Sequence, residues 1–159
     1  MNRRELIAGV VTMPSLALAQ QTNWTPLTFD VHQNNTVVVL CEIIIPKTDT
    51  PGAKEANVNR YIDLIITDGV DAQRTQFLDG LGWLDNYSVN RFGKTFVACD
   101  RTQQTQMVKD CLESNDPNGA PAFMRFAKSM IARLYYNTQA GYQELNKGGR
   151  VPKSFACQA

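Results

Sequence analysis

The sequence contains very little of what most enzymes use for catalysis. It has a single histidine, His32, with no second histidine, cysteine pair or Glu-x-x-His at metal-ligand spacing near it. No Gly-x-Gly-x-x-Gly or Walker-type loop is present, and neither is a Gly-x-Ser-x-Gly elbow or a Cys-x-x-Cys-His haem site. These absences exclude the common nucleotide-binding, serine-hydrolase and covalent-haem motifs. We expect His32 to be an ordinary surface residue.

Charge of one sign is also lacking. The 159 residues include 16 basic and 15 acidic side chains. Removal of an N-terminal segment, argued below, takes away Arg3, Arg4 and Glu5 and leaves 14 of each, a net charge of zero. A neutral chain has no electrostatic basis for binding nucleic acid or an anionic membrane. No nucleic-acid partner is therefore expected, and the length suits one domain.

The carboxylates show no spacing that marks a catalytic pair. Two could in principle act as acid and base, but they are scattered along two expected helices, at Asp63, Asp68, Asp71, Asp79 and Asp85. We expect them to lie on the solvated outer faces. The sequence thus predicts no catalytic, cofactor-binding or metal-binding residue in this chain.

What the sequence does have is an export signal at residues 1–19. Arg3 and Arg4 precede an uncharged apolar stretch that is too short to cross a bilayer. Ala17 and Ala19 form an A-x-A-like cleavage site, after which the mature chain would begin. The segment should therefore direct export, and we expect a bacterial periplasmic protein.

The paired arginines leave two interpretations open. One is an ordinary export signal that happens to contain them, and the other is a twin-arginine signal read by its own translocase. Residues 2–7, NRRELI, resemble the twin-arginine pattern, although leucine stands where phenylalanine is commonest. We favour the twin-arginine signal, which is known for carrying proteins that are already folded.

Four cysteines remain after cleavage. An even count in an exported chain permits two disulfides. If 101–114 is helical, Cys99 and Cys111 stand roughly 15 Å or more apart, beyond the reach of a disulfide. We prefer Cys99–Cys157 with Cys41–Cys111. Two alternatives stay open: Cys41 is a buried free thiol, or Cys157 meets a partner.

The apolar pattern predicts five helices. Residues recur at i, i+3, i+4 and i+7 between cap and turn signals. The expected helices run from Thr28 or Asp30 to before Pro46, from Val58 to before Gly69, from Asp71 to before Gly93, from about 101 to 114, and from Ala122 to about Thr138. Five helices with short links predict an all-α, single-domain bundle over residues 20–159.

Several details of this bundle can also be predicted. The helix before Pro46 is apolar around most of its last turns, which is typical of a central core helix. The next helix should bury Val58, Tyr61, Ile62 and Ile65. Irregular chain is expected in three places, which are a mobile leader at 20–28, an extended link at 95–99 and a tail from about 142.

Two of the irregular segments carry apolar residues. The loop at 46–57 is rich in turn formers, with Pro51 and Gly52 as the strongest turn signal. The tail contains Tyr142, Val151 and Phe155. Apolar side chains on irregular segments either dock on another protein or fold back on their own bundle, and the sequence does not choose between these.

A set of short motifs, in order along the chain, resembles one protein family. The motifs are IIIP at 43–46, TDTPGA at 48–53, VNRYID at 58–63, FLDGL at 77–81, WLD at 83–85, RFGKTF at 91–96 and YYNTQAG at 135–141. In this combination they look like the family of gluconate 2-dehydrogenase subunit 3, over most of residues 36–157. The first three motifs, taken together, are fairly specific.

The resemblance implies a small subunit of a membrane-associated dehydrogenase of sugars or sugar acids. In that family the large subunit resembles the glucose–methanol–choline flavoproteins and holds FAD, and a multihaem cytochrome c subunit often accompanies it. The small subunit is not known for a cofactor or catalytic residues. A folded flavoprotein without a signal could leave the cytoplasm only with a partner that carries one, so this chain would be an export escort.

The contact surface for such a partner should combine three segments. We expect it on the 46–57 loop, the aromatic end of the last helix and the tail, at Pro51, Gly52, Tyr135, Tyr136, Tyr142, Val151 and Phe155. The alternative function is a free-standing periplasmic helical protein that binds a ligand or serves a structural role.

Overall fold

The computed structural model describes residues 24–114 and 120–147, and every regular element in them is helical. The elements are α1 (Val31–Ile44), α2 (Val58–Asp68), α3 (Asp71–Phe92), the 3₁₀ turn η1 (Phe96–Ala98), α4 (Arg101–Glu113), α5 (Ala120–Tyr136) and α6 (Gln139–Leu145). The predicted all-α class is confirmed. The signal residues Arg3, Arg4, Ala17 and Ala19, and the tail residues Val151, Phe155 and Cys157, lie outside the described residues.

Local sequence signals fix several helix ends. Asp30 accepts a hydrogen bond from the Gln33 N–H while the Gln33 side chain returns one to the Asp30 N–H, which is a capping box. Asp100 and Gln103 repeat it at the start of α4. Gly93 ends α3 with a φ of 68°, a left-handed conformation that glycine adopts without a steric penalty. Caps and turn residues therefore predicted these boundaries correctly.

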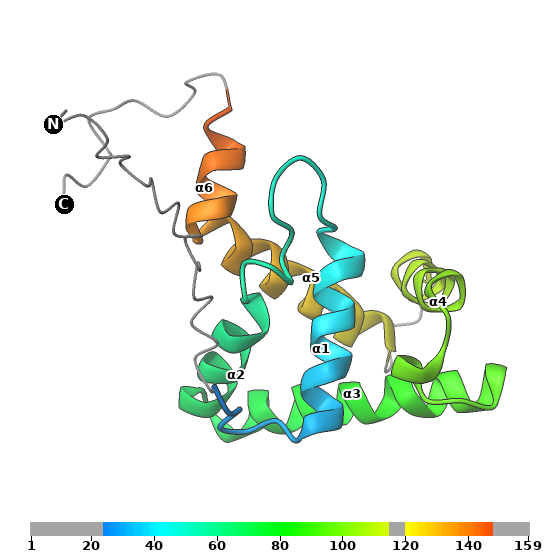
Figure 1. Ribbon diagram of the computed structural model, residues 1–159. Helices are drawn as coiled ribbons and strands as arrows, with labels where there is room; N and C mark the ends of the chain where they lie inside the picture. Colours follow the sequence, from blue (N-terminus) through cyan, green and yellow to red (C-terminus); the bar gives the residue numbers. More distant parts are fainter. Residues whose placement is uncertain (1–23, 115–119, 148–159) are drawn as a thin grey trace, which may run out of the picture.

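Helix α5 occupies the centre of the bundle. It contacts α1, α2, α3, α4 and α6 and lies behind α1 in the view of Figure 1. Its side chains Met124 and Ile131 are completely or almost completely buried, as are Leu40 on α1 and Leu84 on α3. The expectation that the helix before Pro46 would be the central one is wrong, although that helix does supply part of the core.

Three segments expected to be irregular are ordered differently. Residues 139–145 form α6, so the helical part of the chain continues beyond residue 142. Residues 96–98 of the expected extended link form η1. Within the expected mobile leader, the part from residue 24 lies against α2. Short helices such as α6 are too brief to show a clear apolar period, which is why the sequence did not reveal it.

The three described cysteines are buried free thiols. The predicted Cys41–Cys111 disulfide is therefore wrong, and the alternative of a buried Cys41 thiol holds. Burial raises the pKa of Cys41 to about 12 and that of Cys111 to about 11, so both stay protonated. Cys99 lies 3.2 Å from the Ser88 hydroxyl. Because Cys157 is outside the described residues, the Cys99–Cys157 pairing stays a prediction.

Helix α2 turns two polar side chains inward beside its buried apolar residues Val58, Ile62 and Ile66. Asp63 is buried, and its carboxylate accepts hydrogen bonds from the backbone N–H groups of Leu27 (2.7 Å), Thr28 (3.0 Å) and Phe29 (3.0 Å). Four residues earlier, buried Asn59 donates to the Asn34 side chain on α1 at 2.9 Å. These bonds attach both the leader and α1 to the same side of α2.

This orientation contradicts two expectations. Asp63 was expected on an outer face, yet it is buried. Tyr61 and Ile65 were expected in the core, yet both are exposed, whereas Val58 and Ile62 are buried as predicted. Asn59 and Asp63 can occupy inward positions because each forms hydrogen bonds with another segment of the chain. A polar group can be buried when its hydrogen-bonding capacity is used.

We predict that Asp63→Ala lowers the free energy of unfolding by about 3 kcal/mol, because it leaves three backbone donors without an acceptor. Urea unfolding followed by circular dichroism measures this. Asp68→Ala, an exposed aspartate on the same helix, is the matched control and should change stability by less than about 0.5 kcal/mol. Equal effects of the two substitutions would contradict the role assigned to Asp63.

Candidate partner interface

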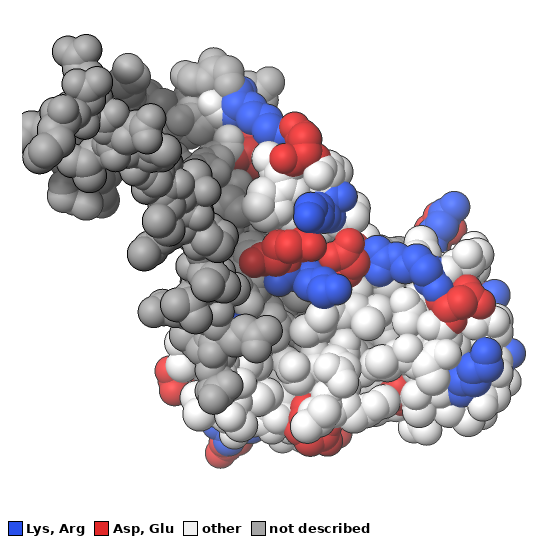
Figure 2. Space-filling model, in the orientation of Figure 1, with Lys and Arg blue, Asp and Glu red and all other residues white. Residues whose placement is uncertain are grey.

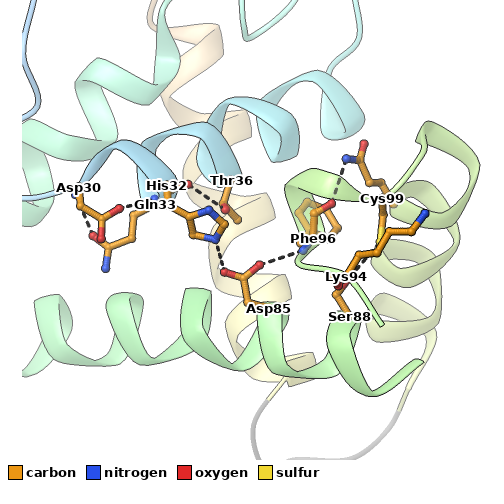
Figure 3. Close-up of polar contacts among 10 residues, drawn as sticks. Asp30, His32, Gln33, Thr36, Asp85, Ser88, Lys94, Phe96 and Cys99 are labelled. Atoms are coloured by element: carbon orange, nitrogen blue, oxygen red, sulfur yellow. Dashed lines mark hydrogen bonds and ion pairs between the residues drawn. The ribbon is translucent and has the colours of Figure 1, made fainter. Parts of the chain in front are cut away.

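The single histidine is paired with an aspartate from a distant part of the chain. His32 Nε2 on α1 lies 2.5 Å from Asp85 Oδ2 on α3 (Figure 3). The other carboxylate oxygen of Asp85 accepts the Phe96 N–H of η1 at 2.9 Å. Asp85 therefore joins α1, α3 and η1. No local pattern predicts this pair, because its members are 53 positions apart in the sequence.

The surroundings of this pair are those of a structural contact. The nearby Ser88 hydroxyl donates to the Lys94 carbonyl at 2.7 Å, and the Thr36 hydroxyl donates to the His32 carbonyl at 3.1 Å (Figure 3). A nucleophile that is activated by histidine must form a hydrogen bond to the imidazole. In the described hydrogen bonds, neither of these two hydroxyls contacts the imidazole. Within residues 24–114 and 120–147, no group of three or more His, Cys, Asp or Glu side chains is placed to hold a metal ion.

The loop at 46–57 is tightly folded. The Ala53 N–H donates to the Ile45 carbonyl, and the Val58 N–H donates to the Ala53 carbonyl, each at 3.0 Å. A Cβ on Gly52 would lie 2.6 Å from the Lys47 nitrogen and 2.7 Å from the Ile45 oxygen, so only glycine fits. The turn predicted at Pro51 and Gly52 is thus present, and it is closed by its own backbone.

Side chains from α5 and α6 attach this loop to the end of the bundle. The Tyr135 hydroxyl donates to the Pro51 carbonyl at 2.8 Å. The Thr50 hydroxyl donates to a carboxylate oxygen of Glu144 at 2.7 Å. Lys147 lies between two carboxylates, 2.9 Å from Asp49 and 2.8 Å from Glu144. In Figure 1 the loop between α1 and α2 stands beside α6 at this end.

The electrostatics of the three charged groups follow from this geometry. Hydrogen bonding from Lys147, then from a neighbouring threonine, lowers the pKa of Asp49 and of Glu144. The two carboxylates in turn raise the pKa of Lys147. Burial raises the pKa of Tyr135, which keeps its hydroxyl protonated as a donor to Pro51. All four groups hold the protonation state that the contacts need at neutral pH.

The structure brings together the predicted interface residues that it describes, but in two different roles. Pro51, Tyr136 and Tyr142 are exposed at this end of the molecule. Tyr135 and Gly52 are buried, so the expectation that they would lie on a contact surface is wrong: Tyr135 holds the loop through its hydroxyl, and Gly52 forms the closed turn within the loop. Val151 and Phe155 are outside the described residues.

One exposed apolar residue at this end was missed. Leu145 is exposed on α6, one turn after Tyr142. Residues three apart on a helix lie on the same face, so the two side chains form one apolar strip. We call Pro51, Tyr136, Tyr142 and Leu145 the aromatic end. Leu145 could have been recognised if a helix had been predicted over residues 139–145.

Helix α6 reaches this position through a close approach of backbones. A Cβ on Gly141 would lie 2.1 Å from the Tyr135 oxygen, so no other residue fits between α6 and the end of α5. Thr138 caps α6 by accepting the Gly141 N–H. The sequence Thr138 to Gly141 therefore sets the angle at which Tyr142 and Leu145 are presented.

The remaining visible surface carries charge of both signs. Figure 2 shows basic and acidic side chains intermixed, with an uncharged expanse over α1. This face therefore carries no patch of one sign. Of the helices formed by residues 24–114 and 120–147, none combines the length and apolar content needed to cross a membrane.

Comparison with protein-family models gives a match over most of the chain. The family model described as gluconate 2-dehydrogenase subunit 3 matches residues 31–149, which is well over half of the chain. The matched region contains every α-helix of the described residues and the complete aromatic end. No curated protein and no solved structure matches this chain.

We predict that Tyr135→Phe lowers the free energy of unfolding by about 1 kcal/mol, because it removes one hydrogen bond while the ring stays buried. Amide hydrogen exchange of Thr50, Gly52 and Ala53 should rise together with the loss of stability. Tyr142→Phe is the matched control, since Tyr142 is exposed, and it should leave both quantities unchanged. Unchanged exchange in Tyr135→Phe would show that the hydroxyl does not hold the loop.

A second prediction concerns pH. Because the carboxyl pKa values of Asp49 and Glu144 are lowered in the folded chain, their contribution to stability is complete above the ordinary values of 3.8 and 4.5 and is lost as pH falls through the lowered values. The loop should thus remain attached from pH 7 to pH 5. Carbon-detected NMR titration of the two carboxyl groups measures their midpoints.

In Lys147→Met, both midpoints should move up toward the ordinary values. Lys128→Met, which changes an exposed lysine outside this cluster, is the control and should leave them in place. Midpoints that do not respond to Lys147→Met would contradict the assigned cause.

Proposed function

Because this chain belongs to the gluconate 2-dehydrogenase subunit 3 family, we propose that it is the non-catalytic small subunit of a membrane-associated, FAD-dependent dehydrogenase of the gluconate or glucose type. It stabilises the flavoprotein large subunit and escorts it during folding and export. The complex oxidises a CH–OH group of a sugar or sugar acid, and the substrate is selected by the large subunit.

The aromatic end is the observation that carries this proposal. Exposed apolar and aromatic side chains in one place are typical of protein–protein contact surfaces. Here they are held by a hydrogen-bonded loop and an ion-pair cluster rather than left on free chain ends. This is the arrangement expected of a surface built to receive a partner.

The division of chemistry between subunits also favours the proposal. FAD belongs to the large, glucose–methanol–choline-type subunit, and haem c belongs to a third, cytochrome subunit where one accompanies the complex. In the described residues the polar side chains nearest to a catalytic arrangement, His32 and Asp85, serve helix packing. The small subunit therefore contributes binding and transport.

The export signal gives the escort role its mechanism. A flavoprotein that folds around FAD in the cytoplasm must cross the inner membrane in its folded state. Arg3 and Arg4 address the whole complex to the twin-arginine translocase, and the complex then works in the periplasm.

Replacing Arg3 and Arg4 by lysine tests the escort role in cells that also express the large subunit. We expect the flavoprotein to accumulate in the cytoplasm and its periplasmic flavin to fall at least tenfold. Arg133→Lys, the same change on an exposed part of α5, is the control and should export normally. Normal periplasmic flavoprotein with the doubly substituted signal would rule the escort role out.

Purification distinguishes the main alternative, a free-standing periplasmic helical protein. A yellow, flavin-containing complex that survives gel filtration supports the subunit role. A stable, colourless monomer purified from the same cells contradicts it.

A further inference from the structure

Helix α2 is apolar on the side that faces away from the bundle. Tyr61, Leu64 and Ile65 are spaced at i, i+3 and i+4 and are 48%, 47% and 42% exposed. Leu27 of the leader, 67% exposed, lines the same hollow as Tyr61 and Leu64. We call these four residues the α2 face. A helix that is apolar on both sides is normally covered on both sides.

The α2 face borders an open hollow of about 320 Å³. Its walls are Trp24 and Leu27 from the leader, Ala56 and Asn57 from the end of the loop, and the outer side of α2. The hollow is therefore continuous with the last residues of the 46–57 loop. The earlier part of the same loop contributes Pro51 to the aromatic end. One partner could cover both surfaces.

Three polar side chains of the hollow, those of Asp63, Arg60 and Asn57, already have partners within the chain. The Asp63 carboxylate accepts three backbone N–H groups. Arg60 stacks on the Trp24 ring at 5.3 Å, and the Asn57 side chain donates to the Glu55 carbonyl at 3.3 Å. A small polar ligand such as a sugar is oriented by several polar groups that converge on it. With these three side chains engaged and Leu27, Ala56 and Leu64 among its walls, the hollow suits an apolar side chain instead.

The exposed area agrees with the size of a protein interface. At ~200 Å² for a large apolar residue, the four exposed fractions correspond to about 400 Å² of accessible surface. An interface of standard size buries about 800 Å² on each partner, and a little over half of that is apolar. The α2 face thus supplies roughly the apolar share of one such interface.

The shape of the surface argues against a second copy of this chain. A twofold dimer places the same patch on both sides of the interface. Two copies meeting through the α2 face would set hollow against hollow and leave both unfilled. A different protein with a protruding apolar side chain fits better.

We propose that the α2 face docks on the flavoprotein large subunit and that the hollow receives an apolar side chain from it. This inference rests on the proposed function and adds a second contact surface to the aromatic end. It explains why Tyr61, Leu64 and Ile65 remain apolar although the fold of this chain does not bury them.

Co-expression of the large subunit with a tagged small subunit tests the proposal. Leu64→Glu and, separately, Leu27→Glu should each reduce the flavin retained per tagged subunit at least tenfold after gel filtration. Val89→Glu is the matched control, because Val89 is a similarly exposed apolar residue on α3, and it should retain flavin like the wild type. Circular dichroism of each purified variant checks folding, and Leu27 lies outside the helices, so its substitution leaves α2 intact.

The outcomes separate this inference from the proposed function. If the wild type retains no flavin, the proposed function itself fails. If the wild type retains flavin and both glutamate variants at the α2 face retain it equally, the function stands and this inference is overturned. An equal loss of flavin in Val89→Glu also overturns this inference. So does a dimer of the small subunit that Leu64→Glu dissociates while flavin retention stays normal.

Discussion

The buried carboxylate of Asp63 sets the arrangement of this protein. Burying a charged group is strongly unfavourable unless hydrogen bonds compensate for the lost water, and here three successive backbone N–H groups do so. The same bonds hold residues 27–29 against α2 and so fix where α1 begins, just after Asp30. The second polar residue on that side, Asn59, connects α2 to Asn34 of α1. These hydrogen bonds, together with the buried side chains of Val58, Ile62 and Ile66, thus determine which way α2 is turned.

The orientation of α2 has a direct consequence for the surface. Asn59 and Asp63 share the buried side of α2 with Val58, Ile62 and Ile66, so Tyr61, Leu64 and Ile65 fall on the opposite side and point outward. A monomer gains nothing from apolar residues there, and their exposure favours association. The internal polar contacts and the external apolar face therefore both follow from the orientation of α2. This combination is typical of a subunit.

Sequence patterns predicted much of the fold but less of the site. The caps at Asp30 and Asp100 and the stop at Gly93 act through nearest neighbours, so they can be recognised locally. The face of α2 could not be, because apolar periodicity assumes that polar residues stay outside, and Asp63 breaks that rule through partners about 35 positions away. The His32–Asp85 pair and the Tyr135–Pro51 bond were hidden for the same reason, although the residues of the aromatic end were singled out by their composition.

The loop at 46–57 gives the two apolar surfaces a fixed relation to each other. Its beginning is held by Tyr135, Glu144 and Lys147, and its end forms a wall of the hollow beside α2. Ordering a flexible segment on binding consumes part of the interaction energy. Because this loop is already closed on Gly52 and bonded to α5 and α6 in the free chain, a partner that spans both surfaces meets them in their final positions. Preorganisation of this kind is what a subunit needs if it must capture a folded flavoprotein before export and hold it afterwards.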